Sequence, residues 1–98
     1  MKILLVCAGG MSTSILMKKM EKYWETQNIP LEIQAVGLAD YLDACKGCDC
    51  VLVGPQVSYR LKEIKDNVGC PCDSIPPTDY ALGNCANILK MVNKLMGK

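Results

Sequence analysis

Short apolar runs alternate with longer mixed segments along the whole chain. Residues 3–6 and 49–53 are mostly aliphatic, which is typical of strands that are buried on both faces of a sheet. Residues 31–36 instead alternate apolar with polar side chains, as expected of a half-covered strand near a sheet edge. Residues 71–75 predict a weaker fourth strand, because two polar side chains interrupt it.

Helical periodicity fills the intervals between these strands. We predict helices over residues 13–27, 39–46, 57–67 and 79–96, where apolar residues recur every three or four positions. In the second of these helices, Leu42 and Cys45 are expected to face inward. The last helix has the strongest period, carried by Leu82, Cys85, Ile88, Leu89, Val92 and Met96.

A strand followed by a helix therefore occurs four times. This alternation predicts an α/β fold of three layers, with a four-stranded parallel sheet and helices on both faces. A doubly wound sheet of this kind has the strand order 2-1-3-4, and ligands bind beyond the carboxyl ends of the first and third strands. The loops after residues 6 and 53 are predicted to meet there. With 98 residues, the chain is expected to form one domain over 1–98.

Cys7 stands at the carboxyl end of the first predicted strand. Small residues follow it, and the hydroxyl side chains of residues 12–14 can cap the next helix. The first turn of a helix has unpaired N–H groups and a partial positive charge, which stabilise a phosphate or a thiolate. Gly9 and Gly10 allow the backbone amides to turn toward an anion. The stretch predicts a nucleophilic thiol inside a phosphoryl-binding loop.

The composition excludes several classes of function. The 11 basic and 10 acidic side chains give a net charge of +1, which provides no electrostatic attraction for nucleic acid or a membrane surface. Phe is absent and Trp occurs once, so there is no aromatic platform for stacked bases. No apolar run is long enough to insert into a membrane. Histidine is also absent, which excludes Cys-His and Ser-His catalytic pairs and leaves Cys7 as the candidate for a covalent phosphoryl carrier.

Seven cysteines raise the question of disulfides or a metal site. The number is odd and no secretory signal is visible, so we interpret the chain as cytosolic with reduced thiols. Cys45 and Cys48 have a zinc-like spacing, but Cys70 and Cys72 are too close together for a zinc knuckle, and Cys50 lies in a buried strand. We therefore predict no metal and no cofactor, and we assign these five cysteines to packing.

The loops after the first and third strands are similar to those of a known family. The phosphorylation loop of the enzyme IIB component of the sugar phosphotransferase system, lactose/cellobiose/diacetylchitobiose family, resembles Cys7-Ala8-Gly9-Gly10-Met11-Ser12-Thr13-Ser14. The second motif of that family resembles Gly54-Pro55-Gln56-Val57-Ser58-Tyr59, and a third, weaker motif resembles Asp79-Tyr80. The length and the order of elements agree with the family over the whole chain.

The resemblance implies that the protein carries a phosphoryl group. Cys7 would accept it from a phosphohistidine on a IIA protein and pass it to a sugar of the cellobiose, chitobiose or lactose type, which a membrane IIC component transports. The phosphate would be held by Ala8, Gly9, Gly10, Met11, Ser12, Thr13 and Ser14. The site would be bordered by Pro55, Gln56, Tyr59 and Tyr80.

Two other functions share this loop and fold. A low-molecular-weight phosphatase or arsenate reductase needs an Arg six positions after the cysteine to clamp the transition state, and it needs a general acid. Thr13 occupies the first of these positions, and Asp79 is the only candidate for the second. A regulatory domain that binds anions without catalysis is the other alternative, and it would form no transferable phosphoryl adduct.

Overall fold

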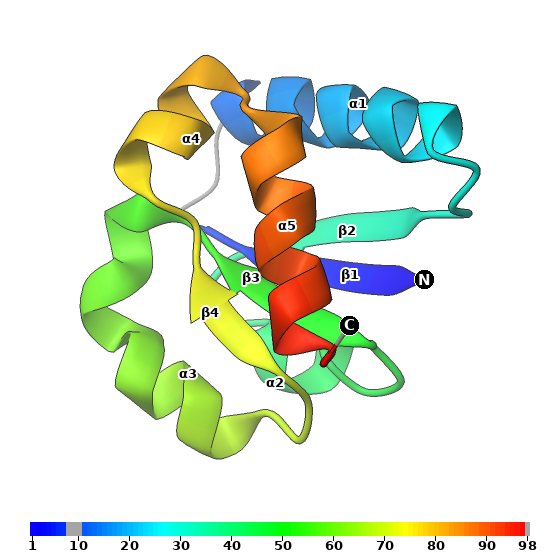
Figure 1. Ribbon diagram of the computed structural model, residues 1–98. Helices are drawn as coiled ribbons and strands as arrows, with labels where there is room; N and C mark the ends of the chain where they lie inside the picture. The colour runs from blue at the N-terminus through cyan, green and yellow to red at the C-terminus, as the bar shows by residue number, and fades with distance from the viewer. Residues whose placement is uncertain (8–10, 98) are drawn as a thin grey trace.

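A parallel sheet of four strands forms the centre of the computed structural model, which describes residues 1–7 and 11–97 (Figure 1). The strands are β1 (Lys2–Val6), β2 (Glu32–Val36), β3 (Cys50–Val53) and β4 (Cys72–Ser74). Their order is β2-β1-β3-β4, and every pairing is parallel. This confirms the predicted 2-1-3-4 topology.

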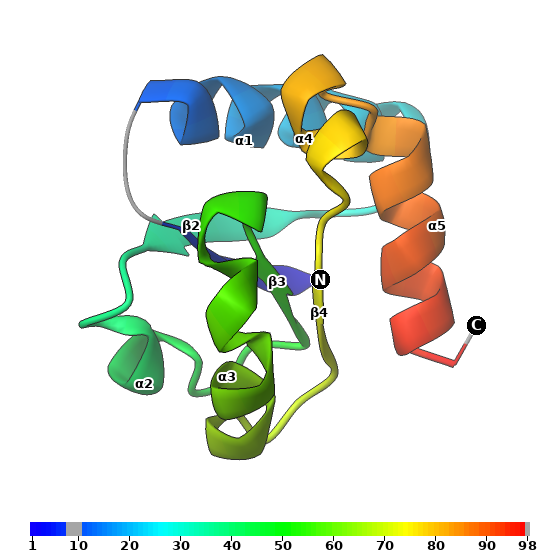
Figure 2. The ribbon, with the colours of Figure 1, turned by 90° about the vertical axis from the view of Figure 1, so that its left-hand side faces the viewer.

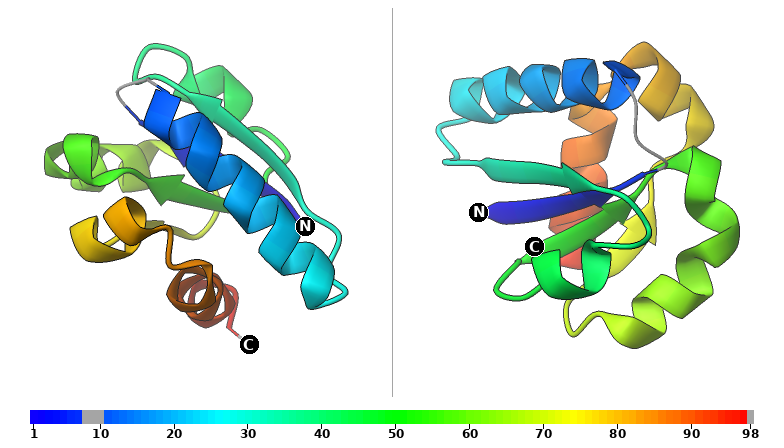
Figure 3. Two further views of the ribbon diagram at one scale, coloured as in Figure 1. Left: turned by 90° about the horizontal axis from the view of Figure 1, so that it is seen from above. Right: turned by 180° about the vertical axis from the view of Figure 1, so that it is seen from behind.

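Helices cover both faces of the sheet, which confirms the three predicted layers (Figures 2 and 3). One face is covered by α1 (Met11–Thr26), α4 (Pro77–Leu82) and α5 (Cys85–Leu95). The other face is covered by α2 (Tyr41–Ala44), the short 3-10 helix η1 (Pro55–Arg60) and α3 (Leu61–Asn67). In the described ranges, no helix combines the length and apolar character needed to cross a membrane.

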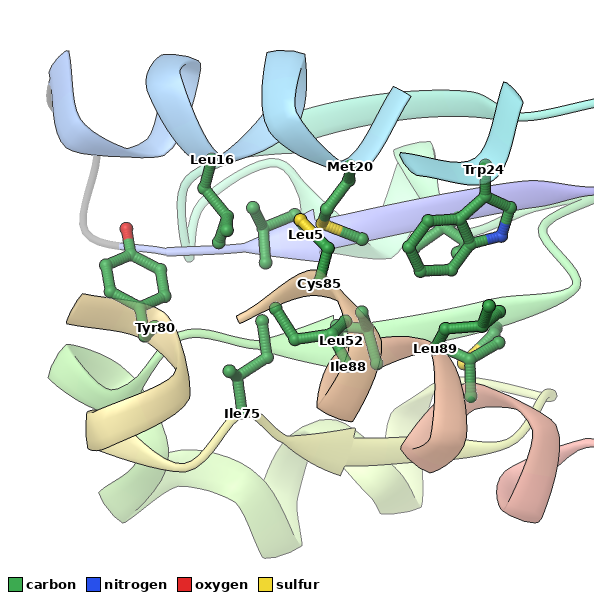
Figure 4. Close-up of a cluster of buried hydrophobic side chains, with 13 residues drawn as sticks. Leu5, Leu16, Met20, Trp24, Leu52, Ile75, Tyr80, Cys85, Ile88 and Leu89 are labelled. Atoms are coloured by element: carbon green, nitrogen blue, oxygen red, sulfur yellow. The ribbon is translucent and has the colours of Figure 1, made fainter. Parts of the chain in front are cut away.

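The two central strands divide their side chains between two apolar layers. Successive residues of a strand point to opposite faces. Ile3 and Leu5 therefore pack with α1 and α5, as Figure 4 shows for Leu5, whereas Leu4 and Val6 pack with residues of α2 and α3. Strand β3 alternates in the same way, and all of its side chains are fully buried. Each fully buried aliphatic side chain stabilises the fold by roughly 1.5–3 kcal/mol. The prediction of two strands buried on both faces is confirmed.

The outer strands also match their predicted character. Glu32 and Gln34 of β2 are exposed, whereas Ile33 and Ala35 are half-buried against the layer of α1. This alternation places β2 at one edge of the sheet, and β4, with only three residues, forms the other edge.

The single helix predicted over residues 79–96 is two helices. α4 ends at Leu82, Gly83 adopts a left-handed conformation with φ of +63°, and α5 begins at Cys85. Asn84 caps α5 by accepting a hydrogen bond from the backbone N–H of Asn87. A left-handed residue ends an α-helix, so the apolar period does not run across the break. Leu82, predicted to face inward, is 69% exposed.

Two further details of the predicted helices are wrong. α2 has only four residues, and it buries Tyr41 rather than Leu42, which is 51% exposed. The Tyr41 hydroxyl accepts a hydrogen bond from Asn67 of α3, at 3.0 Å. α1 begins at Met11, so residues 12–14 lie within its first turn, whereas a capping residue has a non-helical backbone.

Candidate functional site

Cys7 lies directly beyond the end of β1, between the ends of β2 and β3. Its backbone N–H donates to the carbonyl oxygen of Val36 at 3.0 Å, and its thiol makes a weak, longer contact with the same oxygen at 3.8 Å. The side chain is 3% exposed. The neighbouring strands thereby fix Cys7 at the carboxyl edge of the sheet, where parallel α/β folds bind ligands.

The loop after β3 approaches Cys7 most closely at Gly54. The Gly54 N–H donates a hydrogen bond to the Val6 carbonyl oxygen at 2.8 Å. A Cβ atom on Gly54 would lie 3.5 Å from the Cβ of Cys7 and 2.9 Å from Oε1 of Gln56. The two loops predicted to meet at the switch point therefore do meet, and the Gln56 carboxamide lies against the backbone next to Cys7.

The amino end of α1 is at the same edge of the sheet (Figure 1). α1 begins four residues after Cys7, so its unpaired N–H groups and partial positive charge lie at the carboxyl end of β1. Ser14 is exposed in its first turn. The predicted loop residues Ala8, Gly9 and Gly10 lie outside the described residues, as do the side chains of Met11, Ser12 and Thr13.

Tyr80 and Gln56 lie on opposite faces of the sheet. It lies on α4 with 9% exposure, beside Leu16, and its hydroxyl points toward α1 (Figure 4). α4 is tied to α5 by the Asn84 N–H, which donates to the Asp79 carbonyl oxygen at 2.9 Å, and by the Asn87 side chain, which donates to the Asp79 carboxylate at 3.1 Å. The third motif is thus held near the start of α1.

Pro55 and Tyr59 complete the predicted border residues. Pro55 is half-buried at the start of η1, where its carbonyl oxygen accepts a hydrogen bond from the Ser58 hydroxyl at 3.0 Å. Tyr59 is 77% exposed, so its ring extends into solvent from η1. Gln56 places its Oε1 against the Gly54 backbone, next to Cys7.

The one arginine of the sequence is paired with a carboxylate. Arg60 forms an ion pair with Glu63 at 2.6 Å, between η1 and α3. Their hydrogen bond raises the pKa of Arg60 and lowers the pKa of Glu63. A bidentate guanidinium clamp, which cysteine phosphatases need, would have to come from this single side chain.

Burial keeps most of the other thiols protonated. It raises the pKa of Cys50 to about 12 and that of Cys72 to about 11, and it also raises the pKa of Cys48, Cys70 and Cys85. Cys50 and Cys72, which have the largest shifts, are therefore poor nucleophiles at neutral pH. All seven cysteines are free. Among residues 1–7 and 11–97, no group of three or more Cys, Asp or Glu side chains is placed to hold a metal ion.

The contact between the carboxyl end of β2 and Cys7 was not predicted from the sequence. Val36 accepts both hydrogen bonds of Cys7, and a Cβ on Gly37 would be 3.9 Å from the Cys7 carbonyl oxygen. The predicted strand order contained the signal, because it places the carboxyl end of the second strand beside that of the first.

A thiol at the end of a central strand of a doubly wound sheet, followed by the amino end of a helix, places the chain among small α/β proteins whose ligand sites are expected at the switch point. The family model described as "PTS system, Lactose/Cellobiose specific IIB subunit" matches residues 2–91. The chain therefore belongs to the lactose/cellobiose-specific IIB family of the sugar phosphotransferase system, which confirms the resemblance noted in the sequence.

Individual relatives agree with this assignment. The chain is 34% identical to the galactose-specific EIIB component of Lactococcus lactis subsp. cremoris, over 96% of this chain and 94% of that protein. It is 42% identical to the oligo-beta-mannoside-specific EIIB component of Bacillus subtilis, over 65% of this chain and 62% of that protein. The solution structure of the cellobiose-specific IIB component from Borrelia burgdorferi matches with a TM-score of 0.81 and 35% identity, over 99% of this chain and 92% of the other.

Proposed function

We propose that this protein is a cytosolic phosphoryl carrier in which Cys7 is the acceptor. The phosphoryl group comes from a phosphohistidine on a IIA protein and goes to a sugar that a membrane IIC component transports. One observation carries the proposal: in a chain of the IIB family, the Cys7 thiol lies at the carboxyl end of β1, beside Gly54 and before the amino end of α1. Free thiols throughout the chain fit a reducing compartment.

The proposed transfer consists of two displacements at phosphorus. The Cys7 sulfur attacks in line, an S–P bond forms, and the P–N bond to the donor imidazole breaks. The thiol proton is left with the imidazole, so the donor returns to neutral histidine. A sugar hydroxyl oxygen then attacks the same phosphorus, an O–P bond forms, and the S–P bond breaks. The Cys7 sulfur takes up the hydroxyl proton, which restores the thiol. The amino end of α1 stabilises the charge of the phosphoryl oxygens throughout.

A carrier must hold its phosphoryl group without hydrolysing it. Hydrolysis needs a transition-state clamp and a group that activates water. The sequence has no histidine, and its single arginine is paired with Glu63. The site therefore favours a stored phosphocysteine over phosphatase turnover.

The residues around Cys7 have distinct proposed roles. The loop residues 8–14 bind the phosphoryl oxygens, and Pro55 and Gln56 border the thiol from η1. Tyr80 closes the side facing α1, and the exposed Tyr59 is available for contact with a partner protein. The proposed sugar is of the cellobiose, chitobiose or lactose type, as the family implies.

Intact-protein mass spectrometry tests the proposal directly. The protein is incubated with phosphoenolpyruvate, the general phosphotransferase proteins and a IIA protein of the same family. We expect one phosphoryl adduct on the wild type and none on Cys7→Ser. Cys45→Ser is the matched control, because Cys45 is half-buried beyond the opposite edge of the sheet, and it should accept the phosphoryl group normally.

The second half of the reaction is tested by discharge. Adding IIC membranes and one sugar from a panel of β-linked disaccharides should remove the adduct and yield a sugar phosphate. An adduct that persists on Cys7→Ser would contradict the assignment of the acceptor. Hydrolysis of an aryl phosphate, with no adduct from any IIA tested, would favour the phosphatase. If neither activity is found, the anion-binding domain would be favoured.

A further inference from the structure

Three half-buried cysteines lie at the amino ends of the strands, at the opposite end of the sheet from Cys7. Cys45 follows α2, Cys48 lies two residues before β3, and Cys70 lies two residues before β4. All three pack against the same hydrophobic layer, the one shared with α2 and α3. Because the strands are parallel, all of their amino ends lie on one side of the sheet, and Cys7 lies on the other side, at the carboxyl ends. We refer to Cys45, Cys48 and Cys70 as the thiol cluster.

The strand register brings Cys48 and Cys70 close together. Val51 of β3 pairs with Cys72 of β4, and the Val51 N–H donates to the Pro71 carbonyl oxygen at 2.9 Å. Cys48 and Cys70 each lie two residues before a strand, and the same register continued that far would set Asp49 level with Cys70 and make Cys48 its diagonal neighbour. In a parallel sheet with strands about 4.8 Å apart and a rise of about 3.3 Å per residue, such diagonal neighbours have Cα atoms about 6 Å apart. Disulfides span Cα distances of about 4.4–6.8 Å.

Hydrogen bonds hold two of these thiols in place. The Cys48 thiol donates to the Ala44 carbonyl oxygen and the Cys45 thiol donates to the Leu42 carbonyl oxygen, each at 3.3 Å. Electrostatics shows the same proximity, because Cys48 and Cys45 both add to the effect of burial in raising the pKa of Cys70. The exposed fraction of each side chain is intermediate, so small reagents can reach them, whereas Cys50, Cys72 and Cys85 are buried.

We propose that Cys48 and Cys70 form a dithiol modification site that low-molecular-weight disulfides oxidise to an intramolecular disulfide. One thiolate of the pair attacks the reagent, so its S–S bond breaks, one thiol is released and a mixed disulfide remains on the protein. The second thiolate then attacks the protein sulfur of that mixed disulfide and releases the other reagent thiol. The protein loses two electrons and two protons, and the reagent gains both.

The disulfide would connect the loops that precede β3 and β4. It closes a segment that contains β3, η1 and α3, and it restricts the unfolded chain. We expect the Tm to rise by on the order of 10 °C. Cys7 lies at the other edge of the sheet and should stay reduced.

Peptide mapping without reduction identifies the two fragments that a disulfide joins. The native protein is treated with glutathione disulfide, its remaining thiols are alkylated in denaturant, and trypsin then cleaves after Lys46, between Cys45 and Cys48. We expect fragment 47–60 to be joined to fragment 66–90. A link from 47–60 to 23–46 would report Cys45, and any link to 3–18 would report Cys7.

Single variants assign the link to its residues. Cys48→Ser and Cys70→Ser should abolish it. Cys50→Ala and Cys85→Ala alter the same two fragments at buried positions and should retain it. Native Trp24 fluorescence verifies that each variant is folded, because this single Trp is fully buried.

Three results would overturn the proposal. One is the formation of mixed disulfides alone, without a joined fragment pair. Another is a dominant link to 23–46 or 3–18. The third is formation of the 47–60 to 66–90 link at the same rate in urea, which would show that the folded geometry does not direct it.

Discussion

At the scale of single residues, the missing side chain at Gly54 sets how closely two loops approach. Its φ of −65° and ψ of 152° suit any residue, so backbone conformation does not require glycine here. The limited space around Gly54 favours glycine instead, because a Cβ would lie 2.9 Å from Gln56 Oε1 and 3.5 Å from the Cys7 Cβ. The missing side chain at Gly54 therefore leaves room for the Gln56 carboxamide against the backbone next to Cys7.

Gly54→Ala should slow phosphoryl acceptance with little loss of stability. The added methyl group must displace the Gln56 side chain, which is exposed and free to move. We expect a change in the free energy of unfolding below about 1 kcal/mol. The acceptance rate should fall to that of Gln56→Ala, a variant that lacks the carboxamide altogether. Rates come from quenched mass spectrometry of the adduct, and stability comes from urea unfolding.

A double-mutant cycle separates positioning from general damage. If Gly54 acts through Gln56, the Gly54→Ala substitution should have no further effect in the Gln56→Ala background. Wild-type rates in Gly54→Ala would contradict this account, and so would fully additive losses.

The sequence could predict the placement of Cys7 but not its hydrogen-bond partners. A buried strand followed by small residues and a helix is a local pattern, so it is visible without the fold. Val36 reaches Cys7 only through strand pairing, and the approach of Gln56 to the Gly54 backbone depends on the absence of a Cβ at Gly54. Such contacts depend on distances between elements, which a one-dimensional pattern does not carry.

At the scale of secondary structure, the break between α4 and α5 determines where the third motif lies. Gly83 has φ of +63°, and its N–H donates to the Tyr80 carbonyl oxygen at 3.3 Å. The chain changes direction there, so that α4 lies beside the amino-terminal half of α1 while α5 packs along the sheet (Figures 1 and 3). An unbroken helix could not serve both positions.

Gly83→Ala should therefore destabilise the protein by about 1–2 kcal/mol. A left-handed backbone is unfavourable for alanine, and the new Cβ would lie 2.8 Å from Cδ of Lys19, whose flexible chain can move aside. Gly69→Ala is the control, because no atom lies within 4 Å of its Cβ position, and its effect should stay within about 0.5 kcal/mol. Urea unfolding of both variants measures the difference, and equal stabilities would contradict the role of the left-handed turn.

Helix periodicity failed where the helices are short. In the four residues of α2, Tyr41 and Leu42 are adjacent, so the pattern cannot decide which of them is buried. Over 79–96, the three-and-four spacing of apolar residues outweighed Gly83-Asn84, although glycine followed by a capping residue is a stop and start signal. The strand pattern was more reliable, because burial on both faces leaves a continuous apolar run.

At the scale of the whole molecule, two apolar layers enclose thiols on both sides of the sheet. Cys50 belongs to the layer of α1 and α5, and Cys72 belongs to the layer of α2 and α3. Both side chains are at most 5% exposed. Either thiolate would be a buried charge, so the folded state keeps both thiols protonated at pH values where the unfolded chain ionises them.

The fold should consequently lose stability in alkali through these two residues. Burial raises the pKa of Cys50 from its ordinary value of 9.0 to about 12 and that of Cys72 to about 11. Above pH 9 the unfolded state binds fewer protons than the folded state, so the free energy of unfolding falls as pH rises toward the folded values. Between pH 8 and pH 10.5 we expect Cys50 alone to account for about 1–2 kcal/mol of this loss. Urea unfolding under reducing conditions, followed by Trp24 fluorescence, should give a shallower pH dependence for Cys50→Ala than for the wild type. Lysine and tyrosine titrations are common to both proteins, so parallel profiles would show that the buried thiol is not the cause.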